Sequence, residues 1–239
     1  MMKKVLLTLF CCLSTLTQTF AQTEFALAFN SSLFSFGGNG AQSSSFINTS
    51  DVASISGYTN NPYGKKNGLG YGLSVNTKKV FAKHFILGLD VGYEVMRSKI
   101  MITGINSFGP AGSSTLPATG KTNLNTQFLN FQPNFGFRIG QSSTTFDLTA
   151  GMDVGIILDA KEKGQAKTTD GTSITTTNDR KNINTDLRPR VQLAANYQKF
   201  TAHAGYAYGL SNYRGQVACG GGQEVQSRIV RFGVSYRLN

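Results

Sequence analysis

The stretch Phe85–Val95, with the sequence FILGLDVGYEV, alternates apolar residues with small or acidic ones, apart from Ile86. A β-strand repeats every two residues, so the apolar side chains share one face, and Asp90 and Glu94 lie on the other. The stretch therefore predicts a strand with one apolar and one polar face.

Seven further segments show the same alternation, and the first of them is the least regular. They are Phe25–Leu33, Leu69–Val75, Leu129–Ile139, Phe146–Leu158, Leu187–Tyr197, Phe200–Leu210 and Val230–Leu238. Two prolines, Pro133 and Pro189, fall inside these segments. Proline has no N–H to donate to a ladder, so each predicts a bulge or a local break in pairing.

The connections between the segments alternate in length. Short ones lie at 77–82, 140–144 and 198–199, whereas long polar ones, expected to be loops, lie at 37–67, 98–122, 160–184 and 212–226. The loop at 160–184 is expected to be mobile, with Asp170-Gly171 as a turn. Short turns on one side and long loops on the other are typical of outer-membrane barrels.

The chain begins with a basic segment that contains Lys3 and Lys4, followed by an apolar run and Ala21 before Gln22. This order is typical of a secretory signal peptide, and the run is short for a bilayer span of about 20 residues. We expect residues 1–21 to be a cleaved signal peptide and residues 22–239 to be one domain. Cleavage would remove Cys11 and Cys12 and leave Cys219 alone, so no internal disulfide is expected.

No later segment has 18 apolar residues in succession, so a helical span is excluded, and a closed barrel is the structure that can still cross a bilayer. The sequence predicts an all-β protein, an eight-stranded antiparallel up-and-down transmembrane β-barrel. The alternative is a soluble exported β-protein. The membrane reading is favoured because the polar face carries Gly, Asn, Thr, Asp and Arg rather than the Lys and Glu of a soluble exterior.

Charged residues on the polar face are expected to meet inside the barrel and to pair, because buried charges need partners. The expected lumen network consists of Asp90, Glu94, Asp147, Asp153, Arg138, Arg188, Arg190, Arg231 and Arg237. Eight strands enclose a lumen just wide enough for side chains to fill, so no pore is expected.

The segment Arg231–Leu238, RFGVSYRL, places Arg231, Gly233, Tyr236 and Leu238 at the spacing of a terminal assembly signal. It resembles the C-terminal β-signal that the barrel-assembly machinery recognises, although Asn239 follows it. In strand number, glycine-rich alternation and this last segment, residues 22–239 resemble the PorT-like and OmpX-like outer-membrane barrels of Bacteroidetes. The resemblance implies the outer membrane of a Gram-negative bacterium but no single activity; one branch of the family serves type IX secretion.

No catalytic, cofactor or metal site is expected. The histidines are His84 and His203; neither belongs to a His-x-Ser pair, and with Cys219 they give no metal-ligand spacing. Gly220–Gly222 lacks the context of a phosphate-binding loop.

The net charge is +11, or +9 after the loss of Lys3 and Lys4. For an exported chain this favours outer-membrane lipid phosphates over nucleic acid. The other expected partners are the assembly machinery and an unidentified envelope protein; the barrel is expected to be a monomer. Three functions stay open: a non-enzymatic surface-binding or structural protein acting through its long loops, a component of an envelope machine such as type IX secretion, and a rim hydrolase.

Overall fold

The computed structural model describes residues 22–51, 54–109, 112–140, 143–214 and 223–239. The expected signal peptide and Cys219 lie outside these residues. Every regular element in the described ranges is a β-strand, so the predicted all-β class is confirmed, and no helix there is long and apolar enough to cross a membrane. The strands are β1 (Gln22–Gly37), β2 (Ser44–Thr49), β3 (Ser56–Thr59), β4 (Lys66–Phe81), β5 (Phe85–Gly109), β6 (Gly112–Ile139), β7 (Thr144–Thr168), β8 (Ser173–Asp179), β9 (Thr185–Tyr197), β10 (Phe200–Tyr208) and β11 (Gln226–Arg237).

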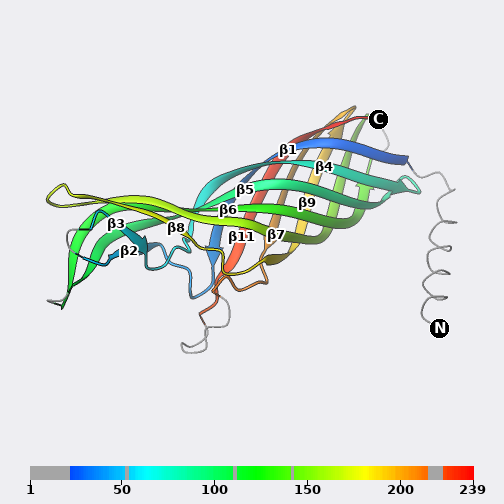
Figure 1. The fold of residues 1–239 in the computed structure, drawn as a ribbon. Coiled ribbons are helices and arrows are strands. Elements are labelled where there is room, and N and C mark those ends of the chain that lie inside the picture. Colours follow the sequence, from blue (N-terminus) through cyan, green and yellow to red (C-terminus); the bar gives the residue numbers. More distant parts are fainter. Residues whose placement is uncertain (1–21, 52–53, 110–111, 141–142, 215–222) are drawn as a thin grey trace, which may run out of the picture.

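Strands β1, β4, β5, β6, β7, β9, β10 and β11 pair in that order as a closed antiparallel ring. The pairing of β7 with β9 and that of β11 with β1 complete the circle. Closure leaves no strand edge in the ring without a neighbour, so backbone donors and acceptors are satisfied around it. Figure 1 shows the ring with the C-terminus at one end.

The predicted total of eight strands is wrong for the sheet, which has eleven. Segments expected to be loops contain β2, β3, β8 and long continuations of β5, β6 and β7. Here β2 pairs in parallel with β5, and β3 in parallel with β8, so the antiparallel description also fails for these strands. The physical reason is pairing: β5 and β6 stay paired from Phe85↔Phe137 to Gly109↔Gly112, with one register shift between Ile102 and Gly104, so neither strand ends where the barrel does.

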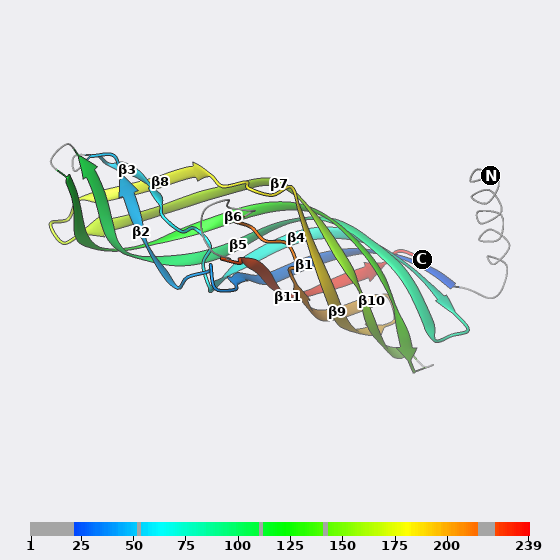
Figure 2. The same cartoon turned by 90° about the horizontal axis from the view of Figure 1, so that it is seen from below.

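We call β2, β3 and β8, together with residues 97–109, 112–127 and 159–168, the extension. Its strands pair in the cyclic order β2–β3–β8–β7–β6–β5 and back to β2, so it forms a second, smaller ring. It leaves the barrel at the end opposite to the C-terminus (Figures 1 and 2). The predicted turn at Asp170-Gly171 is present between β7 and β8, where Gly171 has a φ of 92°.

A hydrophobic core fills the extension and explains why the segments are ordered. Its buried residues are Ile47, Ile100, Ile102, Ile105, Ala118, Ala166 and Ile174. Ile100 and Ile102 continue the inward-facing parity of Glu94 on the same strand. Polar composition predicted a long loop at 98–122, but alternate isoleucines supply enough apolar burial for a packed strand.

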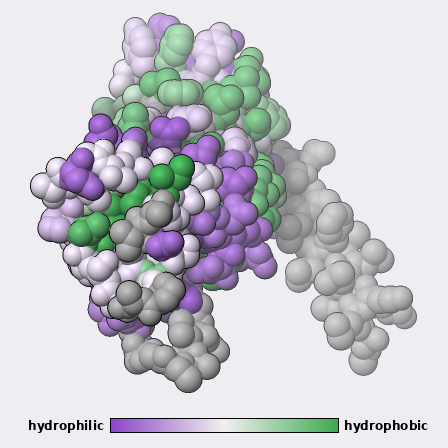
Figure 3. All heavy atoms as spheres, turned by 60° about the vertical axis from the view of Figure 1, so that its left-hand side comes forward, coloured by the Kyte–Doolittle hydropathy of each residue, from purple (hydrophilic) through white to green (hydrophobic). Residues whose placement is uncertain are grey.

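The outer surface of the ring is apolar and its interior is polar, the reverse of a soluble protein. Leu73 is 66% exposed and Phe135 is 63% exposed, whereas Asp153 is fully buried. We call these exposed apolar side chains on the ring strands the belt. Figure 3, which looks toward the extension, shows hydrophobic residues gathered on the more distant barrel and more hydrophilic surface nearer the viewer.

Register shifts occur where two strands leave the belt. One lies on β4 between Asn67 and Tyr71, and the other faces the Gln127/Phe128 step of β6, where Leu158 of β7 is the extra residue. A bulge bends a strand and changes which side chains point outward. These bulges separate the apolar outer face of the ring from the polar outer face of the extension.

The two prolines lie on the outer face, on either side of Met152. Pro189 is the partner of Met152, and the pairing of β6 with β7 is interrupted between Phe131 and Asn134, at Pro133. The predicted break in pairing is therefore present at Pro133. At Pro189 the β7–β9 ladder continues, but the β9–β10 ladder ends one residue away, at Arg190.

We predict that Ile102→Ala loosens the extension and leaves the ring intact. Ile102 is 1% exposed, and such a truncation in a packed core costs about 2–5 kcal/mol. Limited trypsin digestion of the folded protein in detergent should cut the extension faster while the ring stays protected. Met101→Ala, on the neighbouring outward-facing side chain, is the control; equal digestion of the two variants would contradict the assigned core.

Candidate functional site

The lumen holds its first group of charges at the short-turn end of the ring. Arg138 of β6 binds two carboxylates there: its Nη1 lies 2.8 Å from Glu24 Oε1, and its Nε lies 2.7 Å from Asp147 Oδ1. Lys78 Nζ lies 2.7 Å from Asp147 Oδ2, and Arg237 Nη1 lies 2.9 Å from Glu24 Oε1. Five strands are thus joined by one network.

A second group lies further along the lumen. Arg190 Nη2 is 2.6 Å from Asp90 Oδ2, and the same arginine also donates to Gln132. Asn134 Nδ2 donates to Asp90 Oδ2 across 3.4 Å.

The third and most buried group surrounds Arg231 of β11. Its guanidinium donates two hydrogen bonds to Glu94, each 2.8 Å long, and Nη2 lies 3.1 Å from Asp153 Oδ2. Arg188, which is fully buried, lies 3.0 Å from Asp153 Oδ1 and 3.6 Å from Asp186 Oδ2. Its guanidinium also lies 4.8 Å from the centre of the Phe128 ring.

Charge inside the ring is balanced. The ion pairs of the described lumen residues join six carboxylates to six cations, namely Glu24, Asp90, Glu94, Asp147, Asp153 and Asp186 with Lys78, Arg138, Arg188, Arg190, Arg231 and Arg237. Balance matters because the interior is poorly hydrated, and an unpaired charge there is far more costly than at a surface.

Glycines make room for these large side chains. A Cβ on Gly72 would collide with Glu94, and one on Gly155 would collide with the Arg188 guanidinium. The glycine-rich polar face noted in the sequence is therefore a packing requirement of the charges. The filling is incomplete toward the short turns, where a polar cavity lies among Asn30, Asn134 and His203.

All nine side chains expected in the lumen network lie in these groups. Sequence reasoning missed Glu24, Lys78 and Asp186. Each shares the polar parity of its strand, with Asn30 on β1, Ser74 on β4 and Arg188 on β9, so the alternation itself could have placed them in the lumen.

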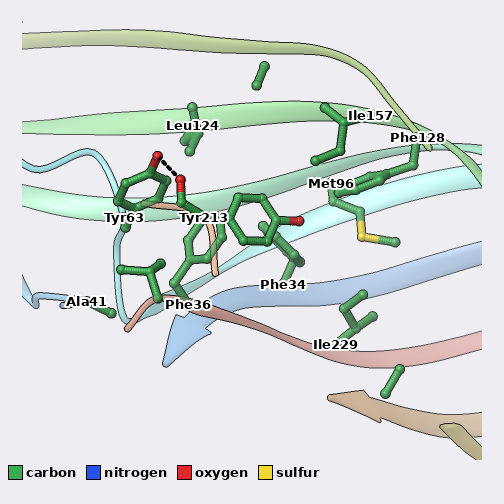
Figure 4. Close-up of a cluster of buried hydrophobic side chains, with 13 residues drawn as sticks. Phe34, Phe36, Ala41, Tyr63, Met96, Leu124, Phe128, Ile157, Tyr213 and Ile229 are labelled. Atoms are coloured by element: carbon green, nitrogen blue, oxygen red, sulfur yellow. Dashed lines mark hydrogen bonds between the residues drawn. The ribbon is translucent and has the colours of Figure 1, made fainter. Parts of the chain in front are cut away.

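An aromatic cluster closes the lumen where the ring meets the extension. Phe34 and Phe36 of β1 pack edge-on at 5.0 Å between ring centres, and Phe36 packs at 5.2 Å against Tyr63 and 4.8 Å against Tyr213. Met96, Leu124, Phe128, Ile157 and Ile229 complete the wall (Figure 4). Sequence reasoning missed this cluster because two of its members, Tyr63 and Tyr213, come from connections that had been expected to be loops.

Two tyrosine hydroxyls of this cluster are buried and fully engaged. Tyr63 Oη donates to the Tyr213 carbonyl at 2.9 Å, the contact drawn in Figure 4, and accepts from Asn182. Tyr213 Oη donates to Asp186 Oδ2 at 2.7 Å. Burial raises the pKa of Tyr63, and burial with the neighbouring Asp186 charge raises the pKa of Tyr213 well above its ordinary value.

Neither histidine belongs to a catalytic arrangement in the described structure. His203 Nε2 lies 3.0 Å from Asn30 Oδ1 inside the lumen. His84 is exposed in a short turn, with Nδ1 3.2 Å from the Arg138 carbonyl oxygen. Among the described residues, no group of three or more His, Cys, Asp or Glu side chains is placed to hold a metal ion. Gly220–Gly222 lies outside the described residues.

The expected assembly signal forms the strand that closes the ring. β11 pairs with β1 and with β10, with Arg231 facing the lumen and Tyr236 in the belt. Asn239, which departs from the signal pattern, extends the contact with β1: it accepts from the Phe25 N–H at 2.9 Å and donates to the Thr23 carbonyl at 2.8 Å.

The profile of the outer membrane protein beta-barrel domain family matches residues 20–214. The chain belongs to this family. It is a protein of the Gram-negative outer membrane, and the closed ring with its apolar belt is the part of the fold suited to that setting.

Solved structures similar to this chain include proteins of Yersinia and Neisseria. Ail, the attachment invasion locus protein of Yersinia pestis, solved with the heparin analogue sucrose octasulfate, is 13% identical, with a TM-score of 0.37 over 91% of this chain and 99% of that chain. Neisserial surface protein A is 11% identical, with a TM-score of 0.36 over 90% of this chain and 98% of that chain. No curated protein matches the chain.

We predict that Arg231→Met destabilises the fold by about 3–5 kcal/mol, because it leaves Glu94 and Asp153 buried without their shared cation. The free energy of unfolding in urea, measured in lipid vesicles, checks this. Arg228→Met is the matched control, since Arg228 is exposed on the same strand. An equal loss of unfolding free energy in the two variants would show that the buried ion group contributes no more to stability than an exposed arginine does.

The raised tyrosine pKa values predict an alkaline limit to stability. Below about pH 10 the tyrosines are protonated in both states, so they add no pH dependence; above it the unfolded chain releases protons that the folded chain retains, and stability falls. Phenolate absorbance in a pH titration should show a late-ionising group that is lost in Tyr213→Phe. Tyr206→Phe, a belt residue, should keep it; ionisation of every tyrosine near pH 10 in the folded protein would contradict the burial.

Proposed function

We propose that this protein is a non-conducting, non-enzymatic outer-membrane barrel that presents the extension as a rigid surface for binding or structural contacts outside the cell. In this proposal the eight-stranded ring crosses the membrane as a monomer after the signal peptide is removed, and β11 is the strand read by the assembly machinery. The short turns then face the periplasm, as in other barrels of this type.

The observation that carries the proposal is that the extension has its own closed pairing and its own core. Glu162 is buried inside it and accepts from Arg180 Nε at 2.6 Å and from the Thr59 backbone N–H at 2.8 Å. A segment that packs this many groups holds its surface in one shape, so less ordering entropy is lost on binding. The paired charges and the aromatic cluster below it support a role that does not involve transport.

The absence of enzymatic activity is supported by the geometry of the described residues, because each histidine is held by an asparagine side chain or a backbone carbonyl. The rim hydrolase considered from the sequence stays a separate alternative. The resemblance to PorT-like and OmpX-like barrels of Bacteroidetes stays a proposal about lineage.

A role in an envelope machine such as type IX secretion is the second candidate. The observation that favours it is apolar exposure on and beside the extension: Phe108 is 52% exposed, Leu116 is 40% exposed, and Ile55, directly before β3, is 71% exposed. Exposed apolar groups of this kind mark contact surfaces when they gather in patches.

The orientation is tested by inserting one epitope tag at Gly171, in the β7–β8 turn, and another at Lys83, in the β4–β5 turn. Antibody added to intact cells should label the Gly171 tag and reach the Lys83 tag only after the outer membrane is opened. Labelling of Lys83 on intact cells would reverse the orientation and contradict the proposal.

The binding role is tested with a variant in which residues 99–122 are replaced by a short Asn-Gly turn, so that the β5–β6 hairpin ends at the barrel. Heat-modifiable gel migration verifies that the ring still assembles. Attachment of whole cells to host matrix, abiotic surfaces and neighbouring cells should fall for at least one of these surfaces relative to cells with the full chain. Attachment unchanged on all of them would contradict a surface-binding role.

A further inference from the structure

One outer face of the extension, together with the adjoining start of β4, is strongly basic. We call the outward-facing residues Lys66, Arg97, Lys99, Lys121, Lys161, Lys163 and Lys167 the basic face. They lie on β4, β5, β6 and β7, four neighbouring strands of the sheet. By contrast, β2, β3 and β8, which form the rest of the extension, contain no Lys or Arg. The charge is therefore confined to one side.

Strand register arranges these cations in rows. One row crosses four strands. Lys66 lies opposite Lys99, Lys99 lies opposite Asn123, and Asn123 lies opposite Lys163. Arg97, Asn125 and Lys161 form the row below. Neighbouring strands lie about 4.8 Å apart and alternate residues about 7 Å apart, so the backbones that carry the cations are about 5–10 Å from one another.

The basic face begins where the apolar belt ends. Arg97 is two residues beyond Val95, the partner of the belt residue Tyr71, and its guanidinium lies 5.6 Å from the centre of the Tyr71 ring. The lowest row is therefore about 7 Å above the belt, at the depth where lipid headgroups meet a barrel. The rows above it continue away from the bilayer.

These cations differ from those of the lumen in having few acidic partners. Within the described residues, Lys161 is the one member of the basic face that forms an ion pair, with Asp159 at 3.4 Å. Like charges directly opposite each other, as at Lys66 and Lys99, destabilise a sheet. Such an arrangement is stabilised when anions from outside the protein lie between the cations.

We infer that the two lowest rows of the basic face bind the phosphate groups of outer-leaflet lipid headgroups, and so fix the base of the extension at the membrane surface. This rests on the proposed function, in which the extension lies outside the cell. Lipid is favoured over a soluble polyanion because the face is continuous with the belt, and the acyl chains of a lipid held by its phosphates would lie against that belt. Lysine serves here as a mobile point charge on an exposed surface.

The test uses the full mature chain, folded in detergent, and the triple variant Lys66→Gln/Lys99→Gln/Lys163→Gln. The matched control, Lys79→Gln/Lys83→Gln/Lys199→Gln, removes three lysines at the short-turn end. Binding is measured with lipopolysaccharide, with the same lipid after phosphatase treatment, and with soluble heparin. We expect the triple variant to lose lipopolysaccharide binding about tenfold or more, the control to keep it, and the dephosphorylated lipid to bind the native protein as weakly as the variant binds the intact lipid.

Equal binding by the triple variant and the control would overturn the inference, as would full binding of the dephosphorylated lipid. Heparin binding as strong as lipopolysaccharide binding, and lost in the same variant, would assign the face to soluble polyanions instead. These outcomes can be told apart from a failure of the proposed function. The proposed function is tested by the attachment of whole cells after the hairpin is replaced, whereas this experiment measures the binding of lipid to the purified protein. A native-like thermal unfolding midpoint of the triple variant shows that its loss of binding is not a loss of fold.

Discussion

The requirement that charges buried inside a membrane barrel be paired governs most of this structure. Among the described residues, six carboxylates and six cations share the lumen, and all of them except Asp186 form ion pairs with another strand. Arg231 alone connects Glu94 of β5 and Asp153 of β7 to the terminal strand β11. The network therefore works as a set of cross-links, and the glycines that face it provide the space it needs.

The same constraint explains the contrast between the two ends of the molecule. Inside the ring, charges are neutralised by the protein itself and the aromatic cluster packs above them. On the extension the core becomes isoleucine-rich, and the outer face carries exposed cations. The bulges on β4 and β7 mark this change of environment, so one continuous sheet has an apolar outer face within the membrane and a charged one beyond it.

Much of the ring could be predicted from alternation alone, because a period of two assigns each residue to lipid or lumen. That rule identified nine lumen charges, and applied fully it would have added Glu24, Lys78 and Asp186. The extension could not be predicted in this way. Polar residues such as Thr175-Thr176-Thr177 have the composition of a loop, and their strand forms because β7 is already in place to pair with them. Parallel pairings such as that of β2 with β5 depend on contacts more than 50 residues apart in the chain, which no local pattern shows.

The most direct test of a lumen filled by balanced charges is ionic conductance. The purified protein, folded and inserted into a planar lipid bilayer, should give no steady channel current under an applied voltage, because the paired charges and the aromatic cluster leave no continuous water path. Stable, reproducible single-channel steps from the folded native protein would contradict the account and show that the lumen is open.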